Sequence, residues 1–84
     1  MIEKLNQLAG FDILIKSRES KYVWARYAAC YLLFEIGLTE CEIADVVGMD
    51  RTTVHYAIRQ FKMKMEINDR LAVRFYNLFK HEIL

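Results

Sequence analysis

The sequence predicts an all-α domain of five helices, and three observations support this. The 84 residues include no proline, the residue that most strongly interrupts a helix. The three glycines, Gly10, Gly37 and Gly48, fall between segments rather than within them. Within those segments apolar residues recur every three to four positions, the spacing of one helix face. A chain of this length forms one small core, so we expect residues 1–84 to be a single domain.

The first half of the chain predicts two helices separated by a loop. The first helix spans Ile2 to Ala9 and stops at a glycine. Residues Phe11 to Ile15 form an apolar segment that we expect to make a single turn and plug the core. Residues 16–21 are polar and basic, which is typical of a loop. The longest helix runs from about Ser20 to Ile36, with Ser20 as its N-cap.

The third predicted helix begins with a capping box. Thr39 is followed three positions later by Glu42, the pattern in which each residue caps a backbone N–H near the other. We expect Gly48, just after this helix, to adopt the left-handed conformation that ends many helices. The residues expected to face the core from this helix are Ile43, Val46 and Val47.

The fourth and fifth helices complete the domain. Asp50 is expected to cap a recognition helix over about 50–65 by accepting the backbone N–H of Thr52 or Thr53. Asn68 is the predicted N-cap of the fifth helix. The apolar face of that last helix comprises Leu71, Phe75, Leu78, Phe79 and Ile83.

Aromatic and cysteine residues are expected to serve packing. The cysteines, Cys30 and Cys41, lack the close Cys/His spacing of a zinc site, and we expect both to be small packing residues. Tyr22 and Tyr56 are left open, since Tyr56 lies on the recognition helix. The aromatic residues whose helical spacing predicts the core are Trp24, Tyr27, Tyr31, Phe34, Phe61, Phe75 and Phe79.

Charge is unevenly distributed although the formal net charge is only +1. Residues 16–26 carry a local charge of +3, residues 27–49 one of −4, and residues 50–66 one of +2. A binding face depends on its local field rather than on the sum, so a nucleic-acid partner remains compatible with this chain. No run approaches the length of a membrane span and no signal-peptide pattern begins the chain, so we expect a soluble cytoplasmic protein with no membrane partner.

The segment from Gly48 to Val54 is the most informative for function. It reads as a tight turn followed by a helix start with an arginine and two threonines. Two helices joined in this way form a helix-turn-helix, whose second helix contacts base edges in the major groove. Threonine is short enough to allow close approach of the helix, and arginine is long enough to reach a base. The sequence therefore predicts binding of double-stranded DNA.

These residues resemble the C-terminal DNA-binding domain of the bacterial replication initiator DnaA. The resemblance covers roughly Ile2 to Ile83 in its order of elements. Its specific part is Glu42-Ile43-Ala44-Asp45-Val46-Val47-Gly48, followed by Asp50-Arg51-Thr52-Thr53-Val54. The family has Glu-Ile-Gly-x-x-Phe-Gly and then Arg-Asp-His-Thr-Thr-Val. The resemblance implies a five-helix fold of the DnaA C-terminal or Trp repressor-like type.

The resemblance also implies roles for individual residues. Arg26 would be the arginine that enters the minor groove, and Arg59 matches a basic position further along the recognition helix. The loop that grips phosphate would hold Lys16, Arg18 and Lys21. The segment that reads bases would hold Asp50, Thr52 and Thr53.

The chain departs from the family in ways that bear on function. Its turn has one residue where the family has two, and Met49 stands where an arginine is expected. Arg51 replaces a base-reading histidine, and because arginine favours guanine, we expect a changed recognition sequence with Arg51 among the DNA-binding residues. The 84 residues hold no ATPase module. The expected role is thus regulation of DNA replication initiation, through replication-origin binding, or of transcription, without origin melting.

Each of these residues can also be explained without any contact to DNA. Arg51 and the basic loop could simply be solvated, the threonines could cap the backbone, and capping alone would explain Asp50. Arg26 could instead pair with Glu35 or another acid of that region. The chain as a whole could be a protein-interaction module of the same fold or a fragment of a larger initiator. His55 and His81 are isolated in the sequence. No catalytic set, metal site, cofactor or small-molecule substrate is predicted, and the oligomeric state is open.

Overall fold

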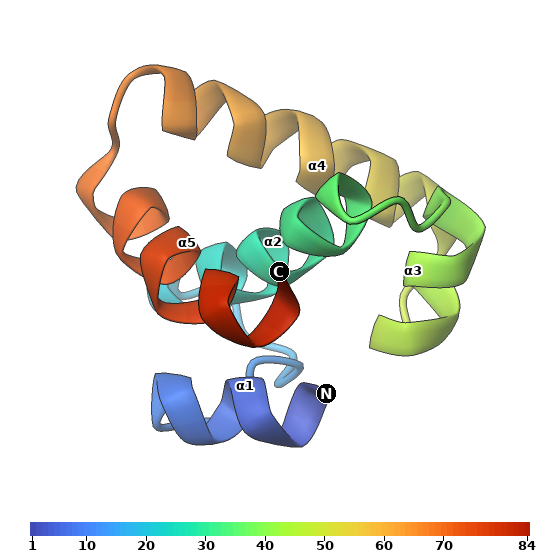
Figure 1. The fold of residues 1–84 in the computed structure, drawn as a ribbon, viewed down its shortest axis with the longest axis horizontal. Coiled ribbons are helices and arrows are strands. Elements are labelled where there is room, and N and C mark those ends of the chain that lie inside the picture. The colour runs from blue at the N-terminus through green and yellow to red at the C-terminus, as the bar shows by residue number, and fades with distance from the viewer.

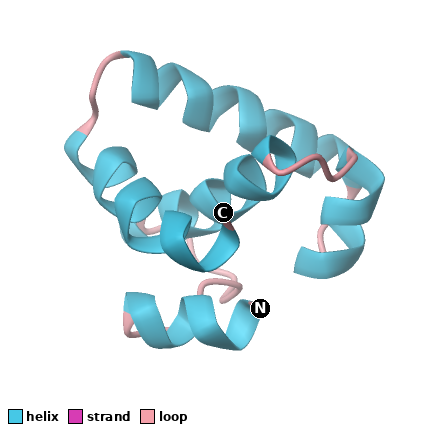
Figure 2. Cartoon of the chain, viewed as in Figure 1, coloured by secondary structure: helices cyan, strands magenta, loops and turns pink.

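The computed structural model describes all 84 residues and contains five helices and no strand (Figures 1 and 2). The all-α fold and the number of helices predicted from the sequence are confirmed. The helices are α1 (Ile2–Ala9), α2 (Ser20–Glu35), α3 (Glu40–Val47), α4 (Arg51–Glu66) and α5 (Arg70–Ile83). No helix is both long enough and apolar enough to cross a membrane.

Helix α2 runs through the middle of the molecule, and α3, α4 and α5 pack on it (Figure 1). Helices α4 and α5 make the most extensive packing with α2, α3 packs on α4 and α2, and α1 packs on α5. The buried positions of α2 include Ala25, Ala28 and Ala29, whose small side chains let two helices approach it closely. Phe61 from α4 and Phe79 from α5, both fully buried, fill the remaining space.

The apolar segment after α1 plugs the core as predicted, except at its last residue, Ile15, which is 46% exposed. Ile13 is fully buried, while Phe11 and Leu14 pack partly against the core. The backbone N–H of Ile13 donates to Oδ1 of Asn6 at 2.8 Å, and the N–H of Ile15 donates to the carbonyl of Asp12 at 3.2 Å. These bonds fold the segment back against α1 and set the direction in which the chain enters the basic loop.

Two predicted N-caps are wrong by one residue. Glu19, not Ser20, occupies the N-cap position of α2 and makes no side-chain cap, so Ser20 lies within the first turn. At α5 the cap is Asp69, whose carboxylate accepts the N–H of Ala72 at 3.1 Å. Asn68 instead adopts a left-handed conformation with φ 55°, which asparagine tolerates better than most residues. The chain thus passes from α4 to α5 within residues 67–69, with the positive φ at Asn68.

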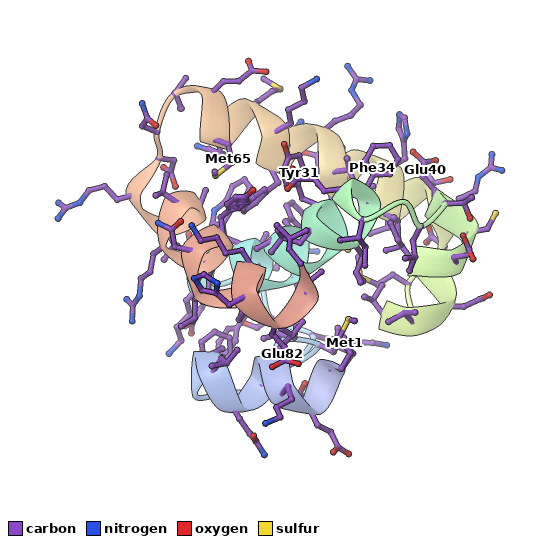
Figure 3. The ribbon with its side chains drawn as sticks, viewed as in Figure 1. Met1, Tyr31, Phe34, Glu40, Met65 and Glu82 are labelled. Carbon is purple, nitrogen blue, oxygen red and sulfur yellow. The ribbon has the colours of Figure 1, made fainter.

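Two helix residues expected in the core are also exposed. Phe34, marked near the C-terminal end of α2 in Figure 3, is 46% exposed, and Val46 of α3 is 42% exposed. A short helix packed on two neighbours buries only a narrow stripe, and α3 buries just Ile43 and Val47 fully. Of the other aromatics expected in the core, Phe61, Phe75 and Phe79 are buried, and Trp24, Tyr27 and Tyr31 are half-buried against it.

The two cysteines have different environments, and only one is a packing residue. Cys30 is buried in α2, whereas Cys41 is exposed on α3. Burial raises the pKa of the Cys30 thiol to about 12, so little of the reactive thiolate form exists near neutral pH.

A thiol-reactive dye at pH 8 is therefore expected to modify Cys41 alone in the folded protein, and both cysteines in concentrated urea. Mass spectrometry of the labelled peptides measures this directly. Rapid labelling of Cys30 in the absence of denaturant would contradict the observed packing of α2.

Candidate nucleic-acid interface

A three-residue turn joins α3 to α4 and fixes how the start of α4 is presented. Gly48 ends α3 in the left-handed conformation, with φ 68°, as predicted. Met49 is half-buried against the core and Asp50 is the N-cap of α4. Upstream, the capping box of Thr39 and Glu42 forms as predicted, with bonds of 2.9 and 3.2 Å. Both helices that border the turn thus have well-defined starts.

Asp50 caps α4 in the predicted way. Its Oδ1 accepts the backbone N–H of Thr53 at 2.7 Å. Hydrogen bonds from Thr53, and more weakly from Thr52, lower the pKa of the Asp50 carboxyl below its ordinary value of 3.8. With this cap in place the next two side chains, Arg51 and Thr52, are exposed, and Thr53 is half-buried.

The cap gives a prediction about pH. Because the pKa of Asp50 is lowered in the folded state, its stabilising effect is present above the ordinary carboxyl value and is lost as the pH falls through the lowered one. Asp50→Asn keeps a capping oxygen but has no charge to lose. The stability difference between wild type and Asp50→Asn should therefore shrink between pH 5 and pH 2. Urea unfolding followed by circular dichroism measures it, and a difference that is constant across this range would refute the coupling.

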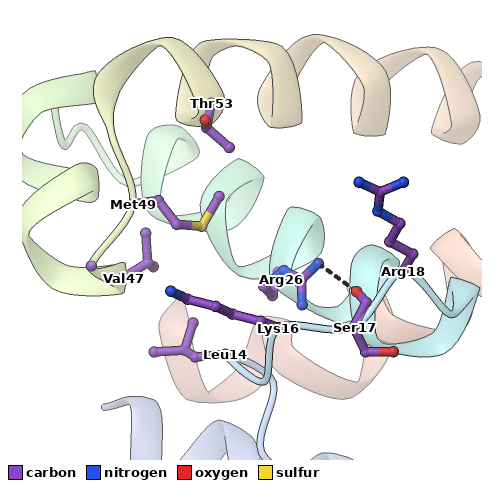
Figure 4. Close-up of a pocket in the computed structure, with 9 residues that line it drawn as sticks. Leu14, Lys16, Ser17, Arg18, Arg26, Val47, Met49 and Thr53 are labelled. Carbon is purple, nitrogen blue, oxygen red and sulfur yellow. Dashed lines mark hydrogen bonds between the residues drawn. The ribbon is translucent and has the colours of Figure 1, made fainter.

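The loop before α2 and the start of α4 border one concavity, which we call the basic hollow (Figure 4). Its volume is about 350 Å³. Three cations line it and no acidic residue does, so its field is positive although the whole chain is nearly neutral. Lys16 and Thr53, 37 positions apart in sequence, both line it. Its lining residues are Leu14, Lys16, Ser17, Arg18, Arg26, Val47, Gly48, Met49 and Thr53.

Arg26 is half-buried at one wall of the basic hollow and is held by the loop. Its Nη1 donates to the carbonyl of Ile15, and its Nη2 donates to the carbonyl of Ser17 at 3.1 Å. The dashed line in Figure 4 joins Arg26 to Ser17. No carboxylate lies within ion-pair distance of Arg26, so the pair with Glu35 or another acid does not form.

Arg51 and Thr52 border a second concavity of about 300 Å³, together with Glu40 and His55. His55 is not isolated as the sequence indicated, because its Nδ1 lies 2.6 Å from Oε2 of Glu40. This contact ties the first residue of α3 to the second turn of α4. The two helices are thereby linked at a point beside the exposed Arg51 side chain.

The remaining predicted site residues lie at different places. Arg59 is exposed on α4, seven residues after Thr52, and so projects from nearly the same face of the helix. Lys21 does not border the basic hollow. Its ammonium group lies 5.0 Å from the ring centroid of Tyr22 and 5.8 Å from that of Phe11. The structure thus brings Lys16, Arg18, Arg26 and Thr53 together and leaves Lys21 outside.

An aromatic row between α2 and α4 was not predicted as part of the site. The rings of Trp24 and Tyr27 are 5.3 Å apart, and those of Tyr27 and Tyr56 are 6.3 Å apart. The Lys64 ammonium lies 5.4 Å from the Trp24 ring centroid. Burial, and then Tyr56, raise the pKa of the Tyr27 hydroxyl. Tyr56 and Lys64 follow Thr53 by three and eleven residues, a helical spacing that could have indicated their shared side of α4.

Chemically, the arrangement offers cations and hydroxyl groups on an exposed surface. Guanidinium, ammonium and hydroxyl groups donate hydrogen bonds to phosphate and to base edges. No group of three or more His, Cys, Asp or Glu residues is placed to hold a metal ion. No protein-family model, no curated protein and no solved structure matches this chain.

Proposed function

We propose that this protein binds double-stranded DNA with sequence preference, using α3 and α4 as a helix-turn-helix with α4 in the major groove. The observation that carries the proposal is the basic hollow, where cations from the loop before α2 line the same concavity as Thr53 in the first turn of α4. Loop and helix start are distant in sequence, and an acid-free surface shared by both is what a phosphate backbone beside the major groove requires. The resemblance to the DnaA C-terminal domain supports the same fold type and function.

The mechanism divides into positioning and reading. Lys16 and Arg18 would neutralise phosphates and set the register of the protein on the duplex, with Arg59 contributing further along α4. Arg51 and Thr52, exposed on the first turn of α4, would contact base edges. Thr53, at the border of the basic hollow, would contact a base or the adjoining phosphate. Asp50 would act mainly through the cap that fixes this first turn.

The biological role we propose follows from binding alone. A domain that occupies initiator-like sites would regulate replication initiation or transcription by controlling access to those sites in the cytoplasm. Neutralising about 4–6 phosphates predicts a slope of log affinity against log salt of about −4 to −5.

A titration of fluorescent random-sequence duplex at low salt tests the proposal by anisotropy. Micromolar or tighter binding that weakens steeply with salt is the expected result. A selection from randomised duplexes then identifies the preferred site. Absence of binding to every duplex at low salt would overturn the proposal.

A second candidate is a protein-interaction module, favoured by the region of residues 27–49. This region carries a local charge of −4 and no Lys or Arg. It exposes three apolar side chains, Phe34, Ile36 and Val46, which are 46%, 41% and 42% exposed. If the protein bound no duplex in the titration above, the result would favour this candidate.

A further inference from the structure

The loop that carries Lys16 and Arg18 is tied to the rest of the protein chiefly through Arg26. Ile15, Lys16 and Arg18 are exposed, and Ser17 is half-buried, so burial does little to hold these residues. The loop's own hydrogen bonds stay within residues 12–19. The two bonds donated by Arg26 are the hydrogen bonds that join residues 15–18 to a more distant part of the chain.

The two acceptors of Arg26 flank Lys16. The carbonyl of Ile15 precedes Lys16 and that of Ser17 follows it, and Ser17 in turn adjoins Arg18. A guanidinium group is a rigid planar fork, so fixing two carbonyls with it fixes the peptide between them. The guanidinium therefore fixes the backbone from which the Lys16 and Arg18 side chains project. Both side chains border the basic hollow.

These bonds also limit what else Arg26 can do. To extend into a minor groove, its guanidinium would have to leave both carbonyls. The loop would then lose its tie to α2 at the moment when its cations are needed at phosphate. Serving the loop and entering a groove are thus competing roles for this one side chain.

We propose that Arg26 is a positioning residue that holds residues 15–18 so that Lys16 and Arg18 face the start of α4, and that it acts on DNA through these two cations rather than by entering the minor groove. The second half of this inference rests on the proposed DNA binding. The first half concerns the free protein and is tested without DNA.

Limited trypsin digestion of the folded protein tests the first half, because trypsin cleaves after Lys16 and after Arg18. Arg26→Ala should accelerate cleavage at these two bonds by about tenfold or more, since loss of two charge-assisted hydrogen bonds favours local opening. Arg26→Lys keeps the charge but replaces the planar fork with a single ammonium centre on a flexible stem, so it should restore slow cleavage only in part. Arg59→Ala, which removes an exposed arginine of α4, is the matched control and should leave the loop unchanged.

Cleavage after Lys62, within α4, separates local from global opening. If Arg26→Ala accelerated cleavage there as much as in the loop, or left the loop unchanged, the positioning role would be refuted. This result does not depend on any nucleic acid.

A double-mutant cycle on duplex binding tests the second half. In wild type, Lys16→Ala should weaken binding and lower the salt slope by about one unit. In the Arg26→Ala background the same change should have little further effect, because the loop cation is already misplaced. Additive losses, together with an Arg26 effect that disappears when flanking A·T pairs become G·C, would show minor-groove contact and overturn the proposal. If no variant binds any duplex, the proposed function fails while the trypsin result still decides the role of Arg26.

Discussion

Phe61→Ala is expected to lower the free energy of unfolding by about 3–5 kcal/mol, the usual range for deleting a buried phenylalanine side chain. Phe61 is fully buried and its ring lies 5.3 Å from that of Tyr31, so the substitution leaves a cavity where α4 packs on α2. A domain of this size has a total stability of about 4–13 kcal/mol, so the variant would lose a large part of it. α4 would then be poorly held for any contact with DNA.

Urea unfolding followed by circular dichroism measures this effect. Met63→Ala is the matched control, because Met63 lies on the same helix two positions later but is 57% exposed. Its effect should stay within about 0.5 kcal/mol, as for most surface substitutions. Equal losses for the two variants would contradict the observed packing of α4.

Arg51→Ala is expected to reduce preference for the selected site by about 1–3 kcal/mol at one or two base pairs, or about 5- to 150-fold, while binding to random duplex changes little. The substitution should not lower the stability of the folded state. Arg51 is exposed, and a cation in the first turn opposes the helix dipole, so its removal is neutral or slightly stabilising. A loss of discrimination can then be attributed to base contact.

The matched control is Lys62→Ala, which removes one exposed charge from the same helix about three turns later. It should weaken selected and random duplexes alike, through the general field. Competition titrations with the selected site and single-base variants of it measure both effects. If Arg51→Ala and Lys62→Ala reduced binding to all sequences equally, Arg51 would not be a base-reading residue.

Local chemistry explains why helix limits could be predicted from the sequence. Three features depend on local sequence: the capping box at Thr39, the left-handed Gly48 and the cap at Asp50. In each of them the interacting residues lie within four positions along the chain, so sequence spacing determines the feature. The cap of α5 was misassigned because Asn68 and Asp69 are adjacent and both suitable. The structure uses Asp69 as the cap and Asn68 for the positive φ.

The features that could not be predicted from the sequence are contacts between segments far apart along the chain. The bonds from Arg26 to the loop span 9 and 11 positions, and the contact between His55 and Glu40 spans 15. Such contacts depend on how helices pack, for which spacing within one helix has no signal. Periodicity likewise identified the buried stripe of α3 but not its width, so Val46 was wrongly assigned to the core.

The packing of α1 on α5 makes the two ends of the helical array depend on each other. α1 is the first of the five helices along the chain, and its main partner, α5, is the last of them. Without α5, Leu5 and the side of α2 that α5 covers lack their apolar neighbours. The five helices should therefore gain resistance to proteases together, once α5 is in place, rather than one after another along the chain.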